Sequence, residues 1–224
     1  MEDLVSINNL NIEARTRAGT LKVVNDLSFT IKKSETLCVV GESGCGKSVT
    51  ALSLMSLLPE GILKVSSGDI LFDNTNLAQL SEAELEGIRG NDISMIFQEP
   101  MTSLNPLFTV GEQVSEVIRR HKNLNKEKAW ASAVELLDAV KIPNPDKRAF
   151  DYPFQLSGGQ RQRVMIAIAL ACQPKILIAD EPTTALDVTI QAEILALINM
   201  LKQETGTAVM FITHDMAVVA QMAD

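Results

Sequence analysis

A glycine-rich stretch that begins at Gly41 has the pattern G-x-x-x-x-G-K-S, which is suited to binding phosphate. Its members, with the residue that follows them, are Gly41, Glu42, Ser43, Gly44, Cys45, Gly46, Lys47, Ser48 and Val49. In such a loop the glycines let backbone N–H groups wrap a phosphate, the lysine reaches the β- and γ-oxygens, and the serine supplies an oxygen to Mg²⁺. The stretch therefore predicts a nucleotide site with Mg²⁺, and a glycine-rich turn without a ligand is the alternative.

Two acidic residues, Asp180 and Glu181, directly follow the apolar run 175–179. A carboxylate in this position can hold Mg²⁺ through water, and its neighbour can orient or deprotonate an attacking water molecule. Taken alone, the pair also fits a solvated turn. Together with the phosphate-binding loop, the pair predicts a site at which metal, nucleotide and water meet.

Two further polar residues stand directly after short apolar runs. Gln98 follows the run 94–97, and a glutamine at such a junction can reach a metal ion or a water molecule. His214 follows the run Ala208–Thr213 and can donate a hydrogen bond to a γ-phosphate. Each residue also has a plainer interpretation, as a solvated or structural side chain.

A serine and a glutamine three residues apart mark the start of a helix that continues through 164–170. The segment consists of Leu156, Ser157, Gly158, Gly159 and Gln160. Serine at the N-cap with glutamine at the third helical position is a capping box, and the two glycines leave backbone N–H groups open to an anion. A well-capped helix with no ligand is the alternative. If another copy of the chain supplied this helix end, it would cover a γ-phosphate.

The surrounding patterns predict the elements that position these residues. The runs Thr36–Val40, 175–179 and Ala208–Thr213 are almost continuously apolar, which is typical of strands buried on both faces of a parallel sheet. Chemistry-bearing residues follow each run, and open α/β sheets bind ligands beyond the carboxyl ends of their strands. Apolar residues at helical spacing predict a helix that Asp187 caps and Gly206 ends.

The rest of the chain predicts two accessory parts. Alternating residues over 4–12 and 23–31 predict a small N-terminal antiparallel sheet, and amphipathic patterns within 99–155 predict inserted helices. The predicted fold is therefore α/β and forms one domain. Its core, with a mostly parallel sheet, comprises 1–98 and 156–224, and an α-helical subdomain is inserted at 99–155.

Composition limits the classes of partner. The net charge is -8 and aromatic residues make up 4% of the chain, which disfavours an extended nucleic-acid surface.

Cys38, Cys45 and Cys172 stand far apart and predict free thiols in a reducing compartment. The longest apolar run, 164–172, has nine residues, about half of the roughly 20 that a bilayer crossing needs. These features predict a soluble cytosolic chain, although a membrane partner remains open. The sequence ends without a helix-closing signal, so we expect it to be truncated.

Taken together, the motifs resemble those of ATP-binding cassette (ABC) transporter ATPases in order and spacing, over nearly the whole chain. Finer features resemble the importer ATPases for dipeptides, oligopeptides, glutathione and nickel. They are QEPMTSLNP from Gln98, FTVGEQ from Phe108, Tyr152-Pro153, Arg161-Gln162-Arg163 and DEPTTALDVTI from Asp180.

The resemblance implies a P-loop NTPase core and a role for each motif. Glu181 would be the catalytic base, acting with Gln98 and His214, and Mg²⁺ would be held by Ser48, Gln98 and Asp180. The segment Leu156, Ser157, Gly158, Gly159 and Gln160 would meet the γ-phosphate of ATP held by an opposite copy, and Asp187 would lie at the subunit junction.

The resemblance also implies cofactors, partners and a location. The cofactors would be ATP and Mg²⁺. The partners would be a second ATPase subunit, identical or paralogous, a membrane permease that docks near Gln98 and the helical insertion, and, indirectly, an extracytoplasmic solute-binding protein. The chain would lie peripherally on the cytoplasmic face of the membrane and would bind no nucleic acid.

Two residues depart from the family pattern. Ala14 stands where an aromatic residue often stacks on adenine, and Phe154 stands where these importers commonly have histidine. Two other classes remain as alternatives. A soluble cassette protein of ribosomes or DNA would typically carry two cassettes or a basic insertion. A small-molecule P-loop kinase would leave the segment 156–160 unexplained.

Overall fold

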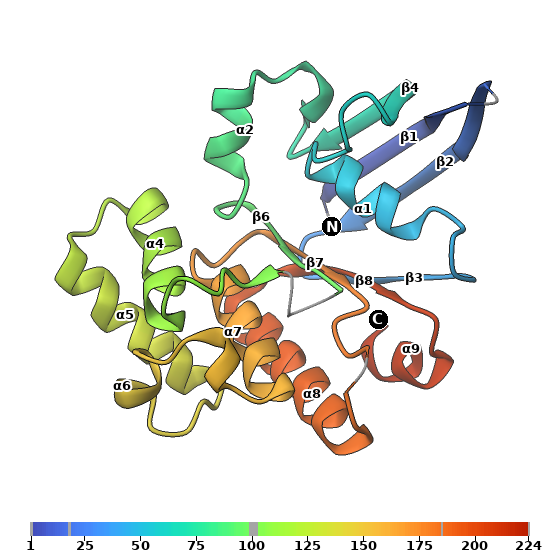
Figure 1. The fold of residues 1–224 in the computed structure, drawn as a ribbon. Coiled ribbons are helices and arrows are strands. Elements are labelled where there is room, and N and C mark those ends of the chain that lie inside the picture. Colours follow the sequence, from blue (N-terminus) through green and yellow to red (C-terminus); the bar gives the residue numbers. More distant parts are fainter. Residues whose placement is uncertain (1, 18, 99–102, 185, 224) are drawn as a thin grey trace. The chain divides into compact units, whose positions relative to one another are not determined.

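The computed structural model describes residues 2–17, 19–98, 103–184 and 186–223 (Figure 1). It divides into two compact units. The first comprises Met1–Arg89 and Ala208–Asp224, and the second comprises Gly90–Thr207.

The first unit contains an antiparallel sheet and a parallel pair of strands. Its strands are β1 (Asp3–Thr16), β2 (Gly19–Lys32), β3 (Thr36–Val40), β4 (Leu63–Phe72), β5 (Thr75–Asn76) and β8 (Ala208–Thr213). The antiparallel sheet has the order β2-β1-β4-β5. Alternate residues of β1, such as Leu10 and Ile12, are fully buried, as expected for a sheet with one face on a core. The predicted N-terminal antiparallel sheet is thus confirmed.

The parallel pair of the first unit joins β3 to β8, in register from Thr36 opposite Val209 to Val40 opposite Thr213. All six residues of β8 are buried, which is the pattern of an internal parallel strand. The helices of this unit are α1 (Lys47–Leu54), α2 (Glu82–Ile88) and α9 (Met216–Met222), with the 3-10 turn η1 (Leu77–Gln79). Helix α9 packs against β3 and β8.

The second unit contains a parallel strand pair and a set of helices. Its elements are β6 (Ile93–Ile96), α4 (Val110–Lys122), α5 (Lys126–Ala139), α6 (Pro145–Arg148), η2 (Pro153–Gln155), α7 (Gly158–Leu170), β7 (Ile176–Asp180) and α8 (Val188–Thr205). Strands β6 and β7 run parallel, with Ile96 opposite Ala179. Figure 1 shows α4, α5 and α6 grouped together, and α5 also contacts α7.

Buried apolar residues at helical spacing hold α4 against α5. Val110 and Val114 on α4 face the same side of that helix as Ile118, and all three are buried. Ala133 and Leu137 on α5 are also fully buried. These helices lie inside the segment 99–155 that was predicted to be helical, and the division of the chain at its ends stays a prediction.

One arginine connects three elements of the second unit. The guanidinium of Arg163, on α7, donates to the backbone oxygen of Val140 at 2.9 Å and to Glu193 on α8 at 2.6 Å. The Arg163 side chain is only 11% exposed. Because arginine presents several donors in a rigid fork, this residue fixes α7 relative to α8 and to the end of α5.

Most elements that the sequence predicted are found close to the expected positions. Strands β3 and β8 have the predicted bounds, whereas β6 and β7 are each shifted by one residue. Strands β4 and β5 and helices α2 and α6 were not predicted. Helix α6 begins at Pro145, and proline is well accepted in the first turn of a helix.

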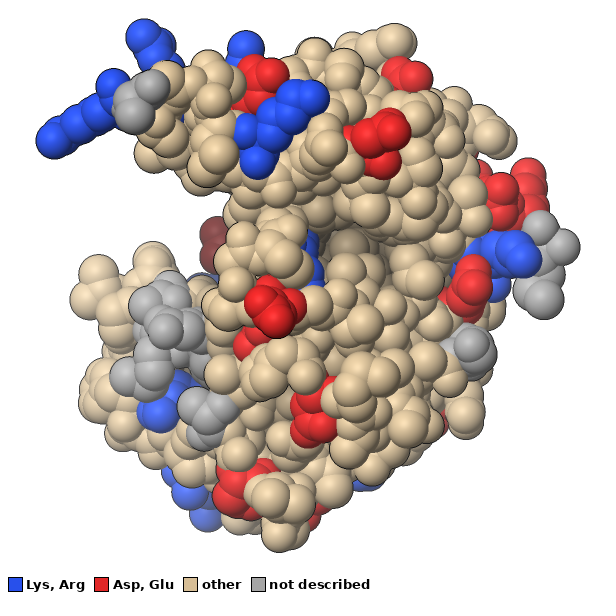
Figure 2. Space-filling model, turned by 90° about the vertical axis from the view of Figure 1, so that its right-hand side faces the viewer, with Lys and Arg blue, Asp and Glu red and all other residues tan. Residues whose placement is uncertain are grey.

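On the face that Figure 2 shows, acidic side chains are scattered among uncharged ones, and several basic side chains project at its upper left edge. Within the part of the chain that the structure describes, no helix is both long and apolar enough to span a bilayer. Within the described residues, no disulfide joins Cys38, Cys45 or Cys172.

Candidate nucleotide-binding and hydrolysis site

The glycine-rich loop 41–48 connects β3 to α1, as the sequence predicted. Gly46 has a φ of 96°, in the left-handed region that L side chains rarely adopt. A Cβ added to Gly46 would lie 2.9 Å from the backbone oxygen of Val23 on β2. The loop therefore needs glycine here for two reasons, its backbone conformation and its close packing against a strand.

Lys47 is folded over the loop. Its side chain is buried, and its Nζ donates to the backbone oxygens of Gly41 at 2.7 Å and Glu42 at 2.8 Å. The N-cap residue of α1 is Gly46, which has no side chain to cap the helix, and the first-turn N–H groups of any helix lack acceptors within that helix. An ammonium group and uncapped N–H groups at one loop form an environment that fits a phosphate group.

His214 lies at the same edge of the first unit as the loop. Val40, the residue before Gly41, pairs with Thr213, the residue before His214. Parallel strands in this register deliver Gly41 and His214 side by side at their carboxyl ends. The His214 side chain is exposed there.

The second parallel pair brings Gln98 and Glu181 together. Asp180 is the last residue of β7 and is only 4% exposed, and Glu181 follows it with a φ of 46°. Nε2 of Gln98 donates to Oε2 of Glu181 at 3.3 Å, although 83 residues separate the two in the sequence. A left-handed φ at a glutamate is uncommon and costs conformational energy.

A tight turn follows Glu181. The N–H of Thr184 donates to the backbone oxygen of Glu181 at 3.1 Å, and the Thr184 hydroxyl donates to Oε2 of Glu181 at 2.9 Å. Pro182 occupies the second position of this turn, where its fixed φ is favoured. Thr184 was not among the predicted site residues. The order Glu-Pro-x-Thr is the sequence signal that indicates it.

The helix end at 156–160 has the predicted capping box. Oγ of Ser157 accepts from the N–H of Gln160 at 3.3 Å, and Oε1 of Gln160 accepts from the N–H of Ser157 at 3.0 Å. Arg161 holds the preceding turn by donating to the backbone oxygen of Leu156 at 2.6 Å and to that of Pro153 at 3.3 Å. Arg161 therefore fixes the approach to this helix end, a role that the sequence alone did not indicate.

The two glycines of this helix end have different surroundings. A Cβ added to Gly159 would lie 2.9 Å from Cγ2 of Ile190, near the start of α8, whereas a Cβ added to Gly158 would meet nothing within 4 Å. Asp187 caps α8 by accepting from the N–H of Ile190 at 2.9 Å, as predicted. Packing within the chain explains glycine at 159 and leaves the space beside Gly158 open.

This difference predicts opposite effects of two alanine substitutions on stability. We expect Gly159→Ala to lower the free energy of unfolding by about 1–3 kcal/mol, because Cγ2 of a β-branched side chain cannot easily move aside. Gly158→Ala should leave it unchanged or slightly raise it, since alanine is the better helix former. Urea denaturation of both variants measures this. In a double-mutant cycle, Ile190→Ala should offset part of the Gly159→Ala loss, and strict additivity would contradict the contact.

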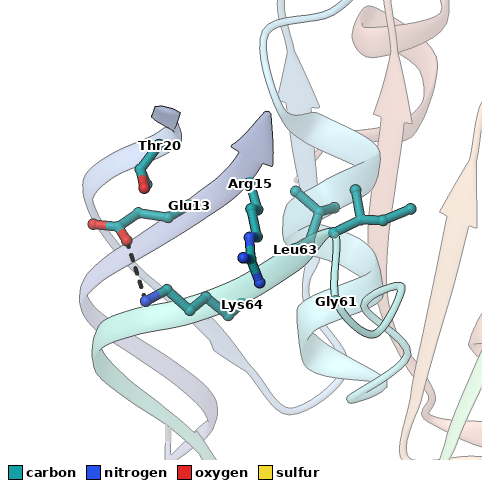
Figure 3. Close-up of a pocket in the computed structure, with 7 residues that line it drawn as sticks. Glu13, Arg15, Thr20, Gly61, Leu63 and Lys64 are labelled. Carbon is teal, nitrogen blue, oxygen red and sulfur yellow. Dashed lines mark ion pairs between the residues drawn. The ribbon is translucent and has the colours of Figure 1, made fainter. Parts of the chain in front are cut away.

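A pocket of about 410 Å³ opens on the antiparallel sheet (Figure 3). It is lined by Glu13, Arg15, Thr20, Gly61, Ile62, Leu63 and Lys64. Figure 3 shows Glu13 and Lys64 turned toward each other, with Oε2 and Nζ 3.5 Å apart. The pocket flanks Ala14, which pairs with Leu63, but its lining includes no residue of the predicted nucleotide site.

The predicted site residues are thus divided between the two compact units. The loop 41–48 and His214 belong to the first unit. Gln98, Asp180, Glu181 and the segment 156–160 belong to the second. Among the described residues, no three His, Cys, Asp or Glu side chains gather in a way that could hold a metal ion.

The sequence and fold assign the chain to a family. Residues 24–184 match the family described as ABC transporter, so the chain belongs to the ABC transporter family. The fold agrees. The solved dimeric structure of the ATP-binding cassette MJ0796 in a post-hydrolysis state, bound to ADP and Pi, superposes with a TM-score of 0.86 at 32% identity. That match covers 97% of this chain and 91% of the other.

Among curated proteins, the chain is similar to ATP-binding proteins of importers and peptide transporters. The chain is 54% identical to the dipeptide transport ATP-binding protein DppD of Bacillus subtilis (strain 168), over all of this chain and 67% of DppD. It is 53% identical to the glutathione import ATP-binding protein GsiA of Salmonella paratyphi A, over 99% of this chain and 36% of GsiA. The family and the α/β P-loop fold that the motifs implied are therefore confirmed.

Proposed function

We propose that this chain is the ATP-binding and ATP-hydrolysing subunit that energises an importer, with peptides as the transported class and glutathione or nickel as alternatives. The observation that carries the proposal is the phosphate-binding loop with Lys47 folded over it, in a chain of the ABC transporter family. The similarity to DppD and GsiA, whose names state dipeptide transport and glutathione import, supports the importer class.

ATP and Mg²⁺ are the proposed cofactors. Residues 41–49 would bind the phosphates, with Lys47 on the β- and γ-oxygens. Ser48, Gln98 and Asp180 offer the oxygen ligands that Mg²⁺ prefers, and the nucleotide phosphates would complete its coordination. Bound Mg²⁺ would neutralise charge on the phosphates during transfer to water. Glu181 would take a proton from the attacking water, and His214 would donate to the γ-phosphate. The convergence of these residues on one nucleotide draws on the family membership.

The first proposed partner is another copy or a paralogue of the chain. The helix end of α7 would cover the γ-phosphate bound by the opposite subunit, with Leu156 and Gln160 framing Ser157 and the glycines. The open space beside Gly158 supports this role. Val188, next to Asp187 at the start of α8, is 83% exposed and therefore accessible to a partner chain. MJ0796, a similar cassette, was solved as a dimer.

A membrane permease is the second proposed partner. Leu107, Phe108, Phe150, Tyr152 and Phe154 are exposed apolar side chains that we name the apolar patch. Two backbone hydrogen bonds, from Val110 to Asp151 and from Gly111 to Ala149, join its two segments. Clustered exposed aromatic side chains mark interaction sites, and the amphipathic cytoplasmic helix of a permease fits this one. Docking there would place the chain peripherally on the cytoplasmic face of the membrane.

Phe154 is the residue of the patch that best tests the docking. Its side chain is 70% exposed and stacks on Tyr152 with ring centroids 5.6 Å apart. We expect Phe154→Ser to abolish co-purification with the cognate permease while ATP hydrolysis by the isolated chain stays unchanged. Leu21→Ser, at an exposed apolar side chain of β2, is the matched control. Equal permease recovery with Phe154→Ser would contradict docking at the patch.

The partners of the chain, rather than the chain itself, provide the means to identify the transported solute. Co-purification with the permease and the extracytoplasmic solute-binding protein, followed by mass spectrometry of the bound solute, distinguishes a peptide from glutathione or nickel. Recovery of nucleic acid in a salt-sensitive complex would instead favour the ribosome or DNA class. The division into a core of 1–98 and 156–224 with a helical subdomain at 99–155 is part of this proposal.

A further inference from the structure

Oε2 of Glu181 accepts hydrogen bonds from two side chains in different parts of the second unit. The Thr184 hydroxyl donates at 2.9 Å and Nε2 of Gln98 donates at 3.3 Å. The shorter bond comes from a residue only three positions further along the chain. Two donors on one carboxylate oxygen fix the plane of the carboxylate and therefore the direction in which its other oxygen faces.

The backbone holds the Thr184 hydroxyl in this position. The turn from Glu181 to Thr184 is closed by a backbone hydrogen bond of 3.1 Å, and Pro182 restricts its second residue. Thr183, within the turn, is buried, which anchors the turn to the core. The hydroxyl is thus positioned by a turn that begins at Glu181, whose own φ of 46° lies in the left-handed region.

The exposure of Thr184 argues against a purely structural reason for this hydrogen bond. A buried hydroxyl must find a protein partner to offset its lost hydration, whereas an exposed hydroxyl can bond to water. Thr184 is exposed, yet its hydroxyl is directed onto the carboxylate of the proposed catalytic base.

We propose that Thr184 is a positioning residue for hydrolysis, whose hydroxyl orients the Glu181 carboxylate toward the attacking water. The inference rests on the proposed function, because it requires Glu181 to act as the base. Thr184 would not touch the nucleotide. Its loss should therefore slow the chemical step and leave ATP binding intact.

The test compares Thr184→Val, which is nearly isosteric and lacks the hydroxyl, with Thr184→Ser, which keeps it. We expect Thr184→Val to lower kcat about tenfold, with the Kd for Mg-ATP within about twofold of the parent value. Thr184→Ser should restore kcat to near the parent value. Thr75→Val, at an exposed threonine of β5, makes the same chemical change elsewhere and should have no effect.

Measurements on the Glu181→Gln variant distinguish a failure of this inference from a failure of the proposed function. In single-turnover measurements on Glu181→Gln, adding Thr184→Val should cause no further loss, since the base is already absent. If Glu181→Gln is inactive but Thr184→Val hydrolyses at the parent rate, the positioning role is wrong and the proposed function stands. If Thr184→Ser is as slow as Thr184→Val, or if Thr184→Val weakens ATP binding as much as it slows kcat, the positioning role is likewise overturned. If Glu181→Gln hydrolyses normally, the proposed function itself fails.

Discussion

Replacing Lys47 by alanine should abolish nucleotide binding. The variant loses a buried ammonium that lies within 2.8 Å of two loop carbonyl oxygens and is placed to contact phosphate. Hydrogen bonds between charged groups are about twice as strong as neutral ones, and a loss of about 3 kcal/mol weakens binding more than 100-fold. Calorimetric titration with ATP, in the presence and absence of Mg²⁺, measures the effect.

Two further variants distinguish loss of charge from collapse of the loop. Lys47→Gln keeps a side-chain N–H donor for the loop carbonyls but carries no charge, and we expect it to bind ATP as poorly as Lys47→Ala. Lys126→Ala removes an exposed lysine at the start of α5 and should leave binding unchanged. If Lys47→Ala bound ATP with the same affinity as the parent chain, the prediction that the loop 41–48 binds phosphate would be wrong.

Replacing Glu181 by glutamine should stop hydrolysis and preserve ATP binding. Loss of a general base slows a reaction by about 10²–10⁴-fold. Glutamine has nearly the same shape and keeps an oxygen that can accept from Thr184, so the turn should stay intact. Because ATP binding closes the proposed dimer and hydrolysis reopens it, the variant should accumulate as a dimer in Mg-ATP.

Phosphate release and size-exclusion chromatography in Mg-ATP and in Mg-ADP measure the two effects together. Glu204→Gln, near the exposed C-terminal end of α8, is the matched control and should hydrolyse ATP at the parent rate. If Glu181→Gln hydrolysed ATP at a rate close to that of the parent chain, Glu181 would not be the catalytic base.

Local patterns in the sequence predicted the features that depend on neighbouring residues. The capping box of Ser157 with Gln160, the cap of α8 by Asp187 and the end of α8 at Gly206 are all found as predicted. Each involves residues close together along the chain, so residue type and spacing are sufficient to specify it. Continuous apolar runs likewise predicted β3 and β8, because strands buried on both faces tolerate few polar residues.

Some of the elements that were missed are too short to show a periodic pattern. Helix α6 spans only Pro145–Arg148, and β5 spans only Thr75–Asn76. Neither is long enough to show a hydrophobic period, so pattern alone cannot separate such elements from loops. Their conformations are selected by the packing of neighbouring elements.

The sequence by itself determined which residue types could bind phosphate, hold Mg²⁺ and activate water, and it placed them at the ends of strands and helices. Only the tertiary structure decided which distant residues meet. The Gln98 contact with Glu181, the close approach of Gly159 to Ile190 and the three-element contact of Arg163 join positions far apart in the chain. Such contacts depend on how strands pair and helices pack. A single sequence records a helix cap in the spacing of its residues, but it carries no comparable local signal for contacts of this kind.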